Sequence, residues 1–141
     1  MRTNEGGTMN WVVAKIKWIM LVSGALTCTM LYAAIAPQAA LRSTFGESLE
    51  GPLAEIVVRN WGALIALVGA MLIYGAYDPP GRPLILTVAG ISKLVFIALV
   101  LAHGRDFLGH QVGVAILIDL AAVALFIAYL IGVRRTRSSA R

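Results

Sequence analysis

Two lone charges inside long apolar stretches are the residues of this chain best suited to chemistry. Lys93 lies near the middle of the run 84–102, and Asp119 interrupts the run 112–132. A charged side chain within the hydrocarbon of a membrane is costly and is rarely kept without a partner or a role. A lysine and a carboxylate can neutralise each other, relay a proton or hold the polar end of an apolar ligand. They form a candidate polar centre.

The depths of the two charges favour pairing. Lys93 precedes Ala102 by nine residues, and Asp119 follows Val112 by seven. At about 1.5 Å of helical rise per residue, these separations put them roughly 13 and 10 Å below the same membrane face. One interpretation is a buried ion pair that fixes the register of two helices. The alternatives are a functional centre for a proton or ligand, or incidental snorkelling.

Composition indicates the elements that must position this pair. The chain has 141 residues, of which 59% are hydrophobic and only 13% charged. Four continuous apolar runs are long enough to cross about 30 Å of hydrocarbon as helices. They cover about 18–36, 61–77, 84–102 and 112–132. We predict an all-α protein in which residues 1–141 form a single transmembrane four-helix domain.

The connections between the runs differ in character. Residues 37–60 are more polar, and Gly51-Pro52 is typical of a helix start. Leu53, Ile56 and Val57 share one face at helical spacing, which predicts a short amphipathic helical segment between the first and second spans. The segment 78–83 holds three prolines and a glycine, so it predicts a tight turn that makes spans two and three antiparallel.

The basic residues indicate orientation. The formal net charge is +5, and basic residues precede the first run, occupy the turn 78–83 and crowd the C-terminus. The positive-inside rule therefore predicts that both termini are cytoplasmic. No aromatic residues interleave with the basic tail, as a single-strand nucleic-acid binder requires, so we expect the bilayer and no nucleic acid as partner.

Small residues repeat at helical spacing on two spans. Such stripes let helix backbones approach closely in a membrane, where hydrophobicity supplies no driving force. They serve either packing within one bundle or a homodimer seam, and the sequence leaves both open. The stripes are Gly62, Ala66 and Ala70 on the second run, and Ala124, Ala128 and Gly132 on the fourth.

Further polar residues cluster near the outer membrane face. Arg59 is a candidate third contact for the polar centre, and Glu55, four residues earlier, can pair with it. Asn60, Glu55 and His103 are candidates for the mouth of a cavity. His103 and His110 stand seven residues apart, which matches no familiar metal-ligand spacing, so we predict no metal site.

The segment that begins FGESLEGPLAEIVVRNWGALIALVG and the later ISKLVFIALVLAHGRD resemble the BphX-like family of small bacterial membrane proteins, a relative of the DoxX-like group. The resemblance runs from the Trp18 region to Tyr129, and its clearest features are Arg59-Asn60-Trp61-Gly62, the proline-rich turn and Ser92-Lys93. It implies a four-helix bundle in a bacterial inner membrane, of unestablished activity. Some DoxX-like relatives are linked to quinone-dependent sulfur oxidation, but this chain lacks the cysteine or histidine cluster such chemistry would use.

Three hypotheses of function follow. The first is a protein that binds a hydrophobic small molecule or lipid, or supports a partner membrane complex, with Lys93, Asp119 and Arg59 as polar contacts. The second is a small proton-coupled transporter acting as a dimer, against which the lysine partner of the one intramembrane carboxylate counts. The third, from family analogy alone, is a quinone-linked redox subunit. No catalytic signature is present, which favours a non-enzymatic role. No cofactor is specified.

Overall fold

The apolar runs fold as helices. The computed structural model describes residues 3–138, and that range holds helices and short connections without a strand. In chain order the elements are α1 (Thr3–Cys28), α2 (Leu31–Ile35), α3 (Pro37–Phe45), α4 (Pro52–Tyr77), α5 (Arg82–His103), the 3-10 helix η1 (Arg105–Gly109) and α6 (Gln111–Ser138). The predicted all-α four-helix bundle is confirmed.

Four helical stretches are long and apolar enough to cross a membrane, as a multi-pass membrane protein requires. They are Asn10–Ile35, Pro52–Tyr77, Arg82–His103 and Gln111–Ser138. Each is longer than the apolar run that predicted it, because polar and charged residues can continue a helix beyond the hydrocarbon. The largest extension is in α4, where the amphipathic lead-in and the second span form one helix that begins at Pro52.

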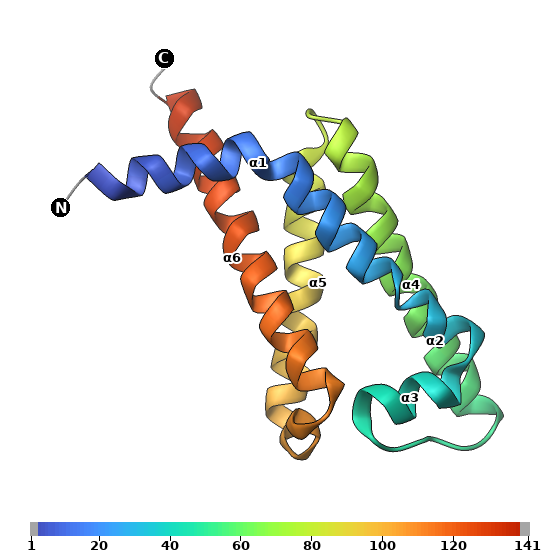
Figure 1. Cartoon of the computed structure of the whole chain (residues 1–141). Helices are drawn as coiled ribbons and strands as arrows, with labels where there is room; N and C mark the ends of the chain where they lie inside the picture. The colour runs from blue at the N-terminus through green and yellow to red at the C-terminus, as the bar shows by residue number, and fades with distance from the viewer. Residues whose placement is uncertain (1–2, 139–141) are drawn as a thin grey trace.

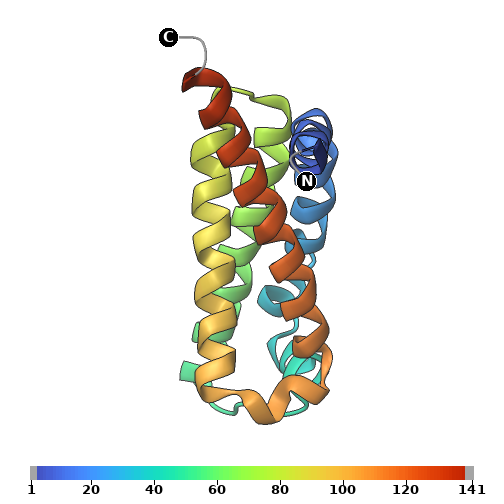
Figure 2. The same ribbon diagram turned by 90° about the vertical axis from the view of Figure 1, so that its left-hand side faces the viewer.

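The four long helices form a ring in which α1 packs on α4 and α6, and α5 packs on the same two helices. The start of α1, the end of α6 and the turn between α4 and α5 lie at one end of the bundle, called here the terminal end (Figure 1). At the opposite end, called the far end, lie α3 and η1 (Figures 1 and 2). α1 crosses α6 near the terminal end and then leads away from it beside α4.

A break separates α1 from α2. The hydroxyl of Thr27 donates to the carbonyl of Ser23 at 2.7 Å, and that of Thr29 donates to the carbonyl of Leu26 at 2.5 Å. Threonine hydroxyls that bond back to the preceding turn often bend helices. The backbone here tightens to bonds three residues apart, from the amide of Met30 to the carbonyl of Thr27 at 3.2 Å. The first span is therefore a bent pair of helices.

Glycines bring α4 against α1 and α2. A Cβ on Gly69 would lie 2.7 Å from the backbone nitrogen of Cys28, and one on Gly62 would lie 2.7 Å from that of Ala34. Real Cβ atoms essentially never come so close, so both positions need glycine for the observed packing. Gly62, the first member of the predicted small-residue stripe, thus packs inside the bundle, whereas Ala70 is exposed.

The connections close the helix ends. Arg82 donates to the carbonyls of Gly75 and Ala76 at 2.9 and 2.8 Å, so it satisfies the last turn of α4. At the far end, α3 is a short helix that buries Ala40 and Leu41. It contacts α4 and α6 as well as α2, and so bridges the two sides of the bundle.

The buried side chains fall into one large core and two small ones. The large core fills the terminal end and draws on α1, α4, α5 and α6. At the far end the core divides: one cluster (Ala33, Ala40, Leu41, Val58) joins α2, α3 and α4, and the other (Ile97, Val100, Val112, Ile116) joins α5 and α6. The buried core is therefore continuous at the terminal end and divided at the far end, where the partly buried Phe45 of α3 packs against both clusters.

Candidate functional site

Lys93 and Asp119 form an ion pair between α5 and α6. The ammonium of Lys93 donates to Oδ1 of Asp119, as the matching depths predicted. The lysine side chain is 10% exposed and that of the aspartate 17%. Each charge is therefore neutralised by the other at a point where little of either reaches the surface of the bundle.

α1 supplies a third polar group to this pair. The hydroxyl oxygen of Thr27 lies 3.4 Å from the ammonium and accepts from it, while the same hydroxyl donates to the carbonyl of Ser23. Both Ser23 and Thr27 are buried. Lys93 has three N–H donors and uses two of them on these partners, and Oδ2 of Asp119 accepts no hydrogen bond within residues 3–138. The centre thus retains one donor and one acceptor for a further group.

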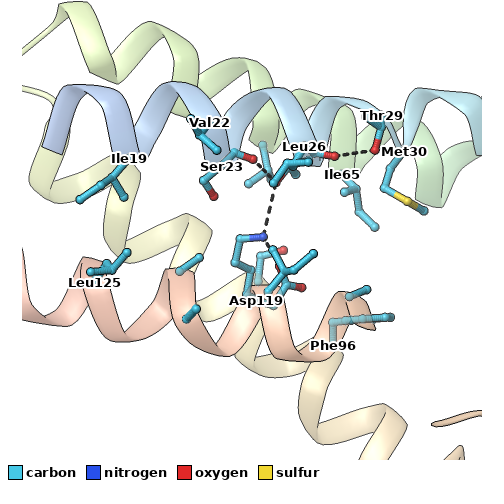
Figure 3. Close-up of a pocket in the computed structure, with 18 of the residues that line it drawn as sticks. Ile19, Val22, Ser23, Leu26, Thr29, Met30, Ile65, Phe96, Asp119 and Leu125 are labelled. Atoms are coloured by element: carbon cyan, nitrogen blue, oxygen red, sulfur yellow. Dashed lines mark hydrogen bonds and ion pairs between the residues drawn. The ribbon is translucent and has the colours of Figure 1, made fainter. Parts of the chain in front are cut away.

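The polar centre opens onto a groove between α1 and α6, with a volume of about 670 Å³. Figure 3 shows Ile19 and Val22 on the α1 side, Leu125 and Asp119 on the α6 side, and Phe96 toward the far end. Ligand cavities in proteins commonly measure about 300 to 1,000 Å³. The volume suits a small amphiphile or one lipid chain.

The groove is lined mainly by apolar side chains and is open toward the outside of the bundle. Val22 is 59% exposed and Ile118 45% exposed, and both line the groove from opposite helices. In a membrane-spanning bundle, side chains exposed at this level meet lipid tails. The groove is therefore accessible sideways from the hydrocarbon, and the Lys93–Asp119 pair lies in its wall.

At the terminal end of the groove stand Trp11, Lys15 and Trp18. All three are exposed and lie on one face of α1. Tryptophan and lysine at this spacing are typical of the membrane–water interface, where the rings lie at the level of the lipid head groups. The apolar run that predicts the first span begins only at Trp18, so it does not single out these residues as part of a site. The signal in the sequence is their spacing of four and three residues, which places all three on one face of a helix.

Arg59 does not reach the polar centre. It donates from Nη1 to the carbonyls of Ala34 and Ile35 at 2.7 and 3.1 Å, which closes the end of α2. Its Nη2 lies 3.9 Å from Oε2 of Glu55, so the predicted pairing of these two is confirmed. Both side chains are about half exposed. Arg59 thus holds the far end of the first span against α4.

The remaining outer candidates lie apart from the groove. Asn60 is exposed and makes no side-chain hydrogen bond within residues 3–138. His103 lines a second apolar cavity of about 350 Å³ at the far end, together with Phe45 and Phe107. Trp61 and Phe96 line both cavities. The structure therefore brings together Lys93 and Asp119, but neither Arg59, Glu55, Asn60 nor His103 joins them.

Comparison of the chain with protein-family models, with curated proteins and with solved structures finds no match. The function must accordingly be argued from the groove itself.

Proposed function

We propose that this protein binds an amphipathic small molecule or lipid in the groove between α1 and α6, with the Lys93–Asp119 pair contacting its polar part. One observation carries the proposal: a cavity of about 670 Å³, open to the lipid side, has an ion pair in its wall that keeps a donor and an acceptor unused. Polar groups in hydrocarbon are costly when left without partners, so a ligand that supplies them gains at this site.

The proposal also includes the membrane in which the protein lies and its orientation there. We place the protein in a bacterial inner membrane with both termini in the cytoplasm, because eight basic residues precede the first span, lie in the turn between the second and third spans or follow the fourth span in the sequence, against three in the other two connections. The likeness of Arg59-Asn60-Trp61-Gly62 and Ser92-Lys93 to the BphX-like family supports this membrane. A periplasmic phosphatase fused after Arg141 should be inactive, and an active fusion would reverse the orientation.

The binding proposal is tested by filling the groove. Ala121 lines the groove, and Ala124, three residues later on α6, does not, although both are exposed. Ala121→Trp should remove the lipids or metabolites that co-purify with the protein, measured by mass spectrometry of the extract. Ala124→Trp adds the same bulk outside the groove and should leave them unchanged. Equal retention by both variants would refute a ligand in the groove.

The same preparation separates the alternatives. A proton-coupled transporter would dissipate a proton gradient in proteoliposomes when its substrate is added, whereas a binding protein gains thermal stability from its ligand without any flux. A quinone among the molecules displaced by Ala121→Trp would support a redox subunit. We favour binding over proton-coupled transport because the Asp119 carboxylate, which a transporter would use, is already paired with Lys93.

A further inference from the structure

The charges along the groove restrict the ligand further, and this step rests on the proposed function. Lys15, at the terminal end, makes no side-chain hydrogen bond or ion pair within residues 3–138. Lys17, two residues later, stacks its ammonium 4.5 Å from the ring of Tyr77 on another face of α1. Lys15 is therefore the cation of this region that is both unpartnered and on the groove.

The two polar parts of the groove, the Lys93–Asp119 pair and Lys15, favour different chemical groups of a ligand. The pair at Lys93 is neutral as a whole, so a charged group placed against it would lie in hydrocarbon without a counter-ion, which is costly. Its spare N–H donor and its spare carboxylate oxygen suit an uncharged hydroxyl, which both accepts and donates. At the terminal end the uncompensated charge of Lys15, between Trp11 and Trp18, suits an anion at the membrane interface.

The distance between the two points follows from the helix. Lys15 and Thr27, the α1 residue that touches the Lys93 ammonium, are 12 positions apart on α1, which is roughly 18 Å of helical rise. Residues of α1 that line the groove continue between them, including Ile19, Val22 and Ser23. The connecting segment of a ligand must therefore be apolar and about 18 Å long.

We infer that the groove binds an amphiphile with two polar ends: an acidic group at Lys15 and an uncharged hydroxyl-type group at the Lys93–Asp119 pair, joined by an apolar chain. A saturated chain rises roughly 1.25 Å per carbon, so about 16 carbons cover the distance. An ordinary phospholipid has its polar groups together at one end of its chains, and it satisfies only the terminal end of this groove.

The experiment uses 16-hydroxyhexadecanoate and hexadecanoate, each also as its methyl ester, titrated calorimetrically into the full chain in zwitterionic nanodiscs. Partition into lipid cancels when each probe's affinity for a variant is divided by its affinity for wild type. Lys15→Gln should weaken both acids about fivefold and leave both esters unchanged. Lys17→Gln is the matched control, because its lysine faces Tyr77, and it should alter none of the four.

The hydroxyl end is tested by chain length on the wild-type protein, which avoids variants that fail to fold. At 16 carbons the hydroxylated acid should bind roughly threefold to tenfold more tightly than its parent acid, after correction for partition, as expected for one added hydrogen bond. At 12 carbons this gain should vanish, because the hydroxyl stops short of the pair. The double variant Lys93→Met with Asp119→Leu should lose the gain at 16 carbons and keep the acid preference.

The outcomes separate the two proposals. Binding of all probes with no preference for acid or hydroxyl, yet abolished by Ala121→Trp, would overturn the two-ended ligand and leave the groove as a binding site. An acid preference that Lys17→Gln removes as strongly as Lys15→Gln would also overturn it, since any surface cation would then serve. No binding of any probe, with co-purified molecules unaffected by Ala121→Trp, would refute both.

Discussion

The two ends of the bundle are built differently, although the same four helices run through both. At the terminal end α1 lies across α6, and side chains such as Met20, Leu72 and Phe126 form one continuous core. At the far end α1 and α2 stay with α4 while α6 stays with α5, so the core divides into two clusters. The groove runs along both halves, from Trp11 and Lys15 beside the continuous core to Thr44 and Trp61 where the core is divided.

The polar centre lies where the continuous core gives way to the divided one. On α5, Lys93 comes between Ala89 of the large core and Ile97 of a far-end cluster. On α6, Asp119 comes between Ala122 and Ile116 of the same two clusters. The ion pair therefore ties α5 to α6 at the level where contact between α1 and α6 is lost. It can serve both as a structural tie and as the polar wall of the groove.

The largest expected effect comes from breaking this pair. Lys93→Met leaves a carboxylate without its partner, and Asp119→Asn leaves an ammonium, so each should lose about 3 to 5 kcal/mol of stability. The double replacement Lys93→Met with Asp119→Leu should restore folding, because a packed apolar substitute for a buried ion pair is often neutral or better. Thermal melts and membrane abundance measure these effects.

The phenotype of cells in which the double variant replaces the wild-type chain then decides between the two roles of the pair. Recovery of abundance and phenotype together in the double variant would mean that the pair is a structural tie. Recovery of abundance alone would assign it a ligand or a proton. Single variants that melt like wild type would show that the two charges do not depend on each other.

A smaller effect is expected where α4 meets the bent first span. Gly69→Ala would put a Cβ 2.7 Å from the Cys28 backbone and 2.8 Å from the Gly24 carbonyl, so the helices must separate. Overpacking of this kind costs about 1 to 3 kcal/mol. Gly109→Ala is the control, because a Cβ at Gly109 meets nothing within 4 Å. If both variants melt alike, the close approach of α1 and α4 does not contribute to stability.

The fold could be predicted from the sequence because each span is a continuous apolar run, and hydrocarbon thickness sets its length. The pairing of Lys93 with Asp119 could be predicted too, since depth follows from counting residues. The groove could not, because it depends on the angle at which α1 crosses α6, and that angle is set by side-chain packing between distant segments. The hydrogen bonds of Arg59 could not be predicted either, because their acceptors are the backbone carbonyls of Ala34 and Ile35, and backbone acceptors have no sequence signature.

The smallest effect compares one substitution at two points of α1. Val12 is 1% exposed in the continuous core, and Val22 is 59% exposed on the groove wall. Truncation at Val12 removes packing contacts of the core and leaves a cavity. A cavity of about 50 Å³ at Val12→Ala should therefore cost about 1 kcal/mol.

Val22→Ala removes the same atoms from a wall that already faces open space, so its melting should stay within about 0.5 kcal/mol of wild type. Because Val22 lines the groove, this variant should instead change which amphiphiles co-purify with the protein, as Val12→Ala should not. Mass spectrometry of the two extracts, taken with the two melts, tests this separation. Equal destabilisation by both variants would mean that the wall at Val22 is packed in the membrane and that the groove is closed there as tightly as the core at Val12.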